Sequence, residues 1–159
     1  MRFEHLVEVN DLSIAGIAPL TRAQLWRGLV IRAELPRLTL IGLDECEILE
    51  RGEDFIRREQ RFGDLRIRDR VSFLPMQSVI YETEQQGELP AARLTMAIEE
   101  PGPGHLYLRF TYVVAETARS IDGLYAAHLK QAYSEADIDT VATIRRLAGE
   151  GLIAGEDGH

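Results

Sequence analysis

In the N-terminal part of the chain, hydrophobic residues recur first at every second position, as in a strand, and then about every 3.6 positions, as in a helix. Apolar and charged positions alternate over residues 3–9, which predicts a strand with one side formed by Phe3, His5, Val7 and Val9. Thr21 is the expected N-cap of a helix, since Gln24 three residues later completes a capping box. Pro36 should end this helix near Leu35.

The apolar face of this first helix gives it a packing surface. It consists of Leu25, Trp26, Leu29, Val30 and Ala33, whereas Arg22, Arg27, Arg32 and Glu34 lie largely off it. Leu20 before the cap and Leu25 after it can form a hydrophobic staple. Trp26 is interpreted as an aromatic of the core or its boundary, with ligand stacking as the alternative.

Six further strands are predicted between residues 44 and 114. They occupy residues 44–50, 55–62, 65–73, 78–84, 91–99 and 105–114, and turns rich in glycine, proline and acidic residues separate them. Short turns join antiparallel strands, so we expect one seven-stranded antiparallel sheet of the α+β class. Leu94, Met96 and Ile98 should face Leu106, Leu108 and Phe110 and give the sheet a strongly apolar inner face.

The hairpin of residues 55–73 has a predictable register. Gly63 and Asp64 form a plausible two-residue turn, which pairs Phe62 with Leu65, Gln60 with Ile67, Arg58 with Asp69, and Ile56 with Val71. One face is then apolar except for Gln60 and the Arg58–Asp69 pair. The other face is highly charged and must be in water: Arg57, Glu59, Arg61, Arg66, Arg68 and Arg70.

The long segment 120–149 organises the rest of the fold. As a helix it places one broad stripe against the sheet: Ile121, Tyr125, Leu129, Ala132, Tyr133, Ala136, Thr140, Ile144 and Leu147. The ends of this stripe are bulky and its middle is small. A helix of this kind should leave a hollow beneath its centre, and that hollow is the functional hypothesis.

Composition and charge exclude several classes of function. The chain has 159 residues, 45% of them hydrophobic and 28% charged, which fits one globular domain over residues 1–150 with a flexible tail at 151–159. Its net charge of −8 argues against a nucleic-acid or anionic-membrane partner. Lys130 is the only lysine and lies on the polar side of its helix, which leaves little basis for Schiff-base chemistry.

Cysteine usage and hydropathy indicate a cytoplasmic protein. The single cysteine, Cys46, cannot form an internal disulfide, and its neighbours Glu45 and Glu47 disfavour a thiolate. We interpret it as a structural thiol. The N-terminus lacks a signal-peptide pattern, and no apolar run approaches the ~20 residues that span a bilayer.

Several separate motifs resemble one protein family. They are the segments 20–29 (LTRAQLWRGL) and 32–34 (RAE), then 61–64 (RFGD), 94–101 (LTMAIEEP), 108–110 (LRF), 131–133 (QAY) and 137–140 (DIDT). Together they resemble the AtaL-like branch of the START and pollen-allergen-like SRPBCC superfamily, over nearly the whole chain. The resemblance implies a helix-grip fold, whose relatives bind lipids, sterols, polyketides or plant hormones under the last helix. It implies no catalytic motif.

Two groups of polar residues are candidates for chemistry in the hollow. Arg58 and Asp69 should pair, because an unpaired buried charge is costly. The pair is either a structural ion pair or an anchor for a ligand carboxylate or phenol. On the long helix, Tyr133 and Thr140 could hydrogen-bond a ligand carbonyl, with His128 and Asp137 at the margin. The alternative is a packing tyrosine and a surface or capping carboxylate.

Other catalytic patterns are missing from the sequence. The four histidines are scattered and show no metal-ligand spacing, and we expect neither a metal nor a cofactor. There is also no dinucleotide-binding, phosphate-loop or nucleophile-elbow motif. No residue is assigned a catalytic role.

The sequence therefore predicts the binding of a small hydrophobic or aromatic molecule between the last helix and the sheet. The candidate ligand-binding residues are Arg58, Gln60, Phe62, Asp69, Met96, Leu108, Phe110, Tyr133, Ala136 and Thr140. An enzyme of aromatase/cyclase or hydratase type is the alternative, with Asp69 or Tyr133 moving protons. A third class is a regulatory or structural partner protein with a filled cavity and an exposed apolar patch. A homodimer is compatible with all three.

Overall fold

A computed structural model describes residues 1–39, 42–117 and 123–153. Its elements are β1 (Arg2–Glu8), α1 (Arg22–Glu34), the 3₁₀ helix η1 (Pro36–Leu38), β2 (Glu45–Arg51), β3 (Phe55–Phe62), β4 (Leu65–Leu74), β5 (Ser78–Thr83), β6 (Ala92–Gly102), β7 (His105–Val114) and α2 (Gly123–Gly149). The predicted element order and the seven-stranded antiparallel sheet are confirmed.

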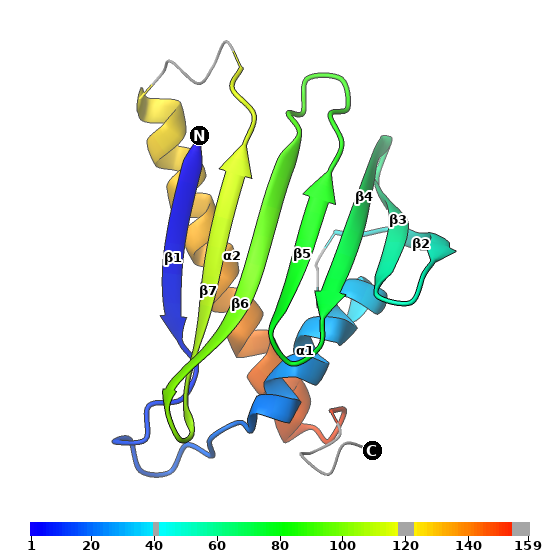
Figure 1. The fold of residues 1–159 in the computed structure, drawn as a ribbon. Coiled ribbons are helices and arrows are strands. Elements are labelled where there is room, and N and C mark those ends of the chain that lie inside the picture. The colour runs from blue at the N-terminus through cyan, green and yellow to red at the C-terminus, as the bar shows by residue number, and fades with distance from the viewer. Residues whose placement is uncertain (40–41, 118–122, 154–159) are drawn as a thin grey trace.

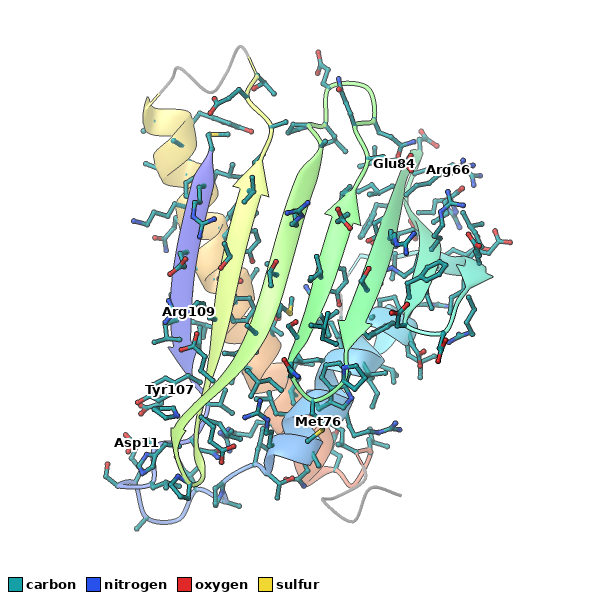
Figure 2. The ribbon with its side chains drawn as sticks, in the orientation of Figure 1. Asp11, Arg66, Met76, Glu84, Tyr107 and Arg109 are labelled. Atoms are coloured by element: carbon teal, nitrogen blue, oxygen red, sulfur yellow. The ribbon has the colours of Figure 1, made fainter. Side chains whose placement is uncertain are left out.

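The seven strands form one sheet with both helices on the same face (Figure 1). The strand order is β1-β7-β6-β5-β4-β3-β2, and every neighbouring pair is antiparallel. The first strand therefore pairs with the last, and consecutive hairpins supply the other neighbours. The opposite face carries charged side chains in ion pairs, such as Arg109 with Glu99 and Arg66 with Glu59 (Figure 2).

Helix α1 begins and ends where its sequence predicts. The Gln24 backbone N–H donates to Thr21 Oγ1 at 3.0 Å, and the Thr21 N–H donates to Gln24 Oε1 at 2.9 Å, so the capping box is complete. Leu35 is the C-cap, and Pro36 opens the 3₁₀ helix. Leu20 and Leu25 are both buried, as the hydrophobic staple requires.

The β3–β4 hairpin has the predicted register. Phe62 pairs with Leu65 and Arg58 with Asp69, and the two-residue turn places Gly63 at a φ of 62°. This is the first central position of the turn, where a left-handed residue matches the twist of the strands. Arg58 and Asp69 consequently share the inner face of the sheet, and both are buried.

The core fills one end of the space between the helices and the sheet. Met96, Leu108 and Phe110 are each at most 1% exposed on the inner face. The buried residues of α2 all lie in its second half: Asp137, Thr140, Val141, Ile144 and Leu147. Ile153, which the sequence placed in the flexible tail, is also buried in this core, and 154–159 lie outside the described residues.

The structure corrects the predicted stripe of α2. Ala132 and Ala136 are exposed, whereas Asp137 and Val141 take the positions that face the core. This part of the prediction was wrong because the buried face was inferred from the apolar residues alone. That inference placed the carboxylate of Asp137 at the margin of the face. In the first half of the helix, Tyr125, Leu129 and Tyr133 are half-buried. Ile121 lies outside the described residues.

Close contact between α1 and α2 depends on a glycine. A Cβ atom at Gly28 would lie 2.9 Å from Ile144 Cγ1 and closer still to Ile144 Cγ2. Ile144 is itself 1% exposed in the packed core, so it can move away only at a cost. The glycine therefore sets how closely the two helices approach.

We predict that Gly28→Ala lowers the free energy of unfolding by about 1–3 kcal/mol through overpacking, despite the better helix propensity of alanine. In an Ile144→Ala background, the same change should be neutral or stabilising. Urea denaturation of the four proteins of this double-mutant cycle measures both effects. An equal cost of Gly28→Ala in both backgrounds would contradict the contact.

Candidate ligand-binding cleft

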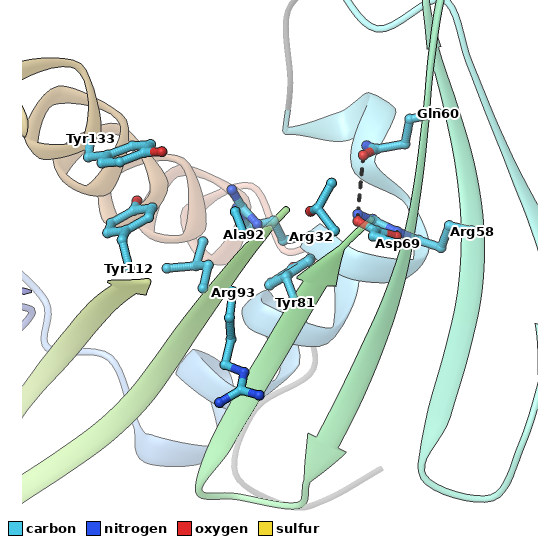
Figure 3. Close-up of a pocket in the computed structure, with 11 residues that line it drawn as sticks. Arg32, Arg58, Gln60, Asp69, Tyr81, Ala92, Arg93, Tyr112 and Tyr133 are labelled. Atoms are coloured by element: carbon cyan, nitrogen blue, oxygen red, sulfur yellow. Dashed lines mark hydrogen bonds and ion pairs between the residues drawn. The ribbon is translucent and has the colours of Figure 1, made fainter. Parts of the chain in front are cut away.

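A cleft lies beneath the first half of α2, beyond the end of the packed core. It has an inner lobe of about 240 Å³ and an outer lobe of about 340 Å³. Both lobes are lined by Gln60, Asp69, Thr83, Ala92 and Tyr133. The inner lobe adds Arg32, Arg58, Tyr81, Arg93, Leu94 and Tyr112 (Figure 3). The outer lobe adds Phe62, Ile67, Leu89, Pro90, Val114, Tyr125 and Leu129.

The cleft brings together part of the predicted site. Arg58, Gln60, Phe62, Asp69 and Tyr133 line one or both lobes. Met96, Leu108 and Phe110 belong to the fully packed core instead.

Ala136 and Thr140 lie at a separate pocket of about 60 Å³ that Arg32 and Ile144 also line. The Thr140 hydroxyl donates to the Ala136 carbonyl at 2.9 Å, so its proton is already used within the helix. The hollow thus lies under bulky half-buried residues near the start of α2, not under the small residues in its middle.

Arg58 and Asp69 form a two-pronged ion pair in the wall of the cleft. Arg58 Nε donates to Asp69 Oδ1 at 2.9 Å, and Nη2 donates to Oδ2 at 2.6 Å. Nη1 donates to the Ala33 carbonyl of α1 at 2.8 Å, and Nη2 also reaches Gln60 Oε1 at 3.3 Å. Burial disfavours the charge of Arg58, but the Asp69 carboxylate outweighs this effect and raises the pKa of Arg58. These contacts favour the structural interpretation of the pair, which also ties α1 to the sheet.

We predict that Arg58→Met lowers the free energy of unfolding by about 3–5 kcal/mol, because it leaves the Asp69 carboxylate buried without a cation. The double variant Arg58→Met/Asp69→Leu should lose clearly less, since no charge remains unpaired. Chemical denaturation at neutral pH gives both values. If the single variant were as stable as the double variant, the pair would not be a coupled structural unit.

A second buried carboxylate connects α2 to two strands. The Tyr112 hydroxyl of β7 donates to Asp137 Oδ1, and His5 Nδ1 of β1 lies 3.1 Å from Asp137 Oδ2. Asp137 is 1% exposed, whereas 31% of the His5 side chain is exposed. Burial raises the pKa of Asp137, and the hydrogen bonds from Tyr112 and His5 oppose this shift. The three residues form a chain of contacts from the surface at His5 to Tyr112 in the cleft.

The Tyr112 ring stacks on the ring of Tyr133, with centroids 3.9 Å apart and planes 8° apart. Phe3 packs edge-on against Tyr133 at 5.7 Å. Burial raises the pKa of Tyr112, and its bond to Asp137 raises it further. Burial likewise raises the pKa of Tyr133. Both phenols are therefore protonated at neutral pH and present flat aromatic surfaces to the cleft.

Sequence reasoning missed several residues of this site, among them Tyr81, Tyr112, His5 and Arg32. Tyr112 lies in phase with Leu108 and Phe110, so the alternation along β7 contained a signal for its inward position. His5 was in phase with Phe3, but its partner on a distant helix left no local signal. Arg32 was placed off the apolar face of α1, yet it lines the inner lobe.

Other candidate residues have no place in the cleft. His128 is exposed, and Cys46 lies at a surface depression beside η1. Burial raises the pKa of the Cys46 thiol, which makes it a weak nucleophile. Among the residues that the structure describes, no cluster of histidine, cysteine or acidic side chains could hold a metal ion. Within the same residues, no helix is long and apolar enough to cross a membrane.

The raised pKa of Asp137 predicts a specific pH dependence of stability. The folded state keeps the Asp137 proton at pH values where the unfolded chain, with a value near 3.8, has lost it. The contribution of Asp137 to stability is therefore fully present below that value and is lost as the pH rises through the folded pKa. Relative to Asp137→Asn, the wild type should lose stability over this range, by at most about 1.4 kcal/mol per pH unit.

Denaturation of both proteins from pH 3.5 to pH 8 measures this difference. Asp139→Asn is the matched control, because it removes an exposed carboxylate from the same helix. A difference between wild type and Asp137→Asn that stayed constant, or that grew in favour of the wild type with rising pH, would overturn the assignment.

Comparison with solved structures defines the class of the fold. The di-domain ARO/CYC StfQ from the steffimycin biosynthetic pathway is similar with a TM-score of 0.68 and 14% identity, over 95% of this chain and 52% of that one. This chain thus spans about half the length of the di-domain. Norcoclaurine synthase from Thalictrum flavum is similar with a TM-score of 0.67 and 11% identity, over 94% of this chain and 87% of that one. Zhui aromatase/cyclase from Streptomyces sp. R1128 has a TM-score of 0.61 and 14% identity, over 93% of this chain and 95% of that one.

The fold is thus that of the helix-grip, START-like SRPBCC superfamily. Within that superfamily, the chain belongs to the AtaL family: the family model described as acetylaranotin biosynthesis cluster protein L matches residues 9–151. The predicted family resemblance is confirmed. No curated protein gives a significant match to this sequence.

Proposed function

We propose that this protein binds a small hydrophobic or aromatic molecule in the cleft between α2 and the sheet. The observation that carries the proposal is an open cleft lined mainly by aromatic and aliphatic side chains, next to a core that is otherwise closely packed. Apolar burial, at about 25 cal/mol per Å², supplies the driving force, and a few polar groups set orientation. The open cleft also favours this function over that of a partner protein with a filled interior.

The stacked tyrosines support an aromatic ligand in particular. Tyr112 and Tyr133 are stacked and protonated, so a flat ligand can continue their stack without displacing charge. The relatives named aromatase/cyclase and norcoclaurine synthase have the same fold at 11–14% identity. That similarity supports a shared cavity architecture. A homodimer stays a prediction for this chain.

Native mass spectrometry of freshly purified protein is the direct test, and a small molecule that remains bound is the expected result. Calorimetry with 2-naphthol then probes the cleft. Ala92 lines both lobes, so Ala92→Trp should fill the cleft and weaken binding at least about tenfold, the equivalent of 1.4 kcal/mol.

Ala97→Trp is the matched control, because Ala97 lies on the opposite face of β6, where it pairs with Ser78 and Arg109. It should bind 2-naphthol like the wild type. Absence of binding to the wild type, or equal binding by Ala92→Trp, would contradict the proposal.

An enzyme is the second candidate, and the contacts of Asp137 favour it. Asp69 is a poor candidate for the base, because its carboxylate is paired with Arg58. Asp137 has no arginine partner among the described residues, and it accepts the Tyr112 proton. In this candidate the Tyr112 oxygen takes a C–H proton next to a ligand carbonyl, while the Tyr112 proton moves to Asp137.

Deuterium exchange at the α-carbon of an aryl ketone, followed by NMR in D₂O, tests this second candidate. The wild type should accelerate exchange over buffer, and Tyr112→Phe should abolish the acceleration. Tyr107→Phe, on the outer face of the same strand, should keep it. Exchange no faster than in buffer would leave ligand binding as the function.

A further inference from the structure

Arg32 is a cation at the cleft without a polar partner in the protein. It is half-buried on α1 and lines the inner lobe. Its guanidinium lies 5.1 Å from the centre of the Tyr81 ring, but within the described part of the chain it makes no hydrogen bond or ion pair. Nearby Arg58, by contrast, is bound to Asp69, Gln60 and the Ala33 carbonyl.

Tyr81 provides a second unsatisfied polar group at the same place. The guanidinium of Arg58 lies 5.3 Å from the Tyr81 ring, so the ring contacts two arginines. Tyr81 is 6% exposed, and its buried hydroxyl has no hydrogen-bond partner among the residues described. A buried hydroxyl is normally paired, so an acceptor from a bound molecule would complete this site.

Among the described residues, no carboxylate around the inner lobe forms an ion pair with Arg32. The charge of Arg58 is balanced by Asp69. Asp137 accepts a hydrogen bond from the Tyr112 hydroxyl, and the charge of Arg32 only partly opposes the rise that burial causes in the pKa of Asp137. Figure 3 shows Arg32 between Tyr112 and the Arg58–Asp69 pair. The protein as a whole has a net charge of −8, so an unpaired cation facing the cleft is a local exception.

The remaining charged residue of the lobe does not change this balance. Arg93 contributes to the lining, but its guanidinium donates to Glu82 at 3.4 Å. Arg93 and Glu82 pair across β5 and β6, and Figure 3 shows the Arg93 side chain directed away from Arg32. Arg32 is therefore the guanidinium available to a ligand in the inner lobe.

We propose that the cleft selects aromatic molecules that carry a carboxylate, and that Arg32 binds this carboxylate in two-pronged fashion. The Tyr81 hydroxyl donates a further hydrogen bond to one carboxylate oxygen, and the aromatic part lies against Tyr112 and Tyr133. A guanidinium matches the planar geometry of a carboxylate and can form two parallel, charge-assisted hydrogen bonds with it. This inference rests on the proposed function and names its ligand class.

A pair of matched probes tests the inference without any mutation. 2-Naphthoate and 2-naphthamide have the same ring and nearly the same shape, but only the first is an anion. Calorimetry at pH 7 should show the wild type binding naphthoate about tenfold to a hundredfold more tightly than naphthamide. Equal affinities, or a preference for the amide, would overturn the inference while leaving the proposed function intact. If neither probe bound, the proposed function itself would fail.

Variants then locate the carboxylate site. Arg32→Met should reduce naphthoate affinity to that of naphthamide, whereas Arg32→Lys should keep part of the preference. Arg27→Met is the matched control, because Arg27 is exposed on the same helix away from the cleft lining, and it should keep the full preference. A naphthoate preference that survived Arg32→Met in a folded protein would assign the site elsewhere.

Tyr81→Phe gives an independent reading. It should weaken naphthoate about threefold to tenfold and leave naphthamide nearly unchanged. Because the hydroxyl has no partner within the described protein, the variant should also unfold at the same or a higher denaturant concentration. A lower midpoint together with unchanged naphthoate binding would show that the hydroxyl serves the fold and not the ligand.

Discussion

Helix α2 must cover the apolar inner face of the sheet, and it does so with only half of its length. The residues that it buries run from Asp137 to Leu147, where the helix also meets α1. At this crossing the missing side chain of Gly28 lets Ile144 pack directly against the α1 backbone. The first half of α2 covers the sheet through long, half-buried side chains, Tyr125, Leu129 and Tyr133. The cleft is the space that this uneven coverage leaves.

Two buried carboxylates stabilise this arrangement in different ways. Asp69 is paired with the Arg58 guanidinium, so its role is to neutralise Arg58 and to hold α1 through that arginine. Asp137 is held by a phenol and an imidazole, and burial favours its protonated form. The first carboxylate therefore belongs to the rigid wall of the cleft. The second links three elements and can change its protonation state.

The sequence specified the fold more completely than the site. The hairpin register was predictable because a two-residue turn and alternating side chains leave only one register with a buried face. The burial of Asp137 was not predictable in the same way, since its partners Tyr112 and His5 lie on strands far away in the sequence. The arginines show the same difference between contacts that the local sequence reveals and contacts that depend on the packing of distant elements. Arg58 had a visible cross-strand partner, whereas the position of Arg32 over the cleft depends on how α1 crosses the sheet.

The one-sided anchoring of α2 also has a dynamic consequence. Residues 137–147 of the helix lie over the packed core, so their backbone amides should open only with the whole domain. Residues 123–133 lie over the cleft and are covered by only a few side chains. Local unfolding is thus cheaper at the beginning of this helix than at its end. A molecule bound in the cleft should therefore slow amide hydrogen exchange in residues 123–133 more than in residues 137–147.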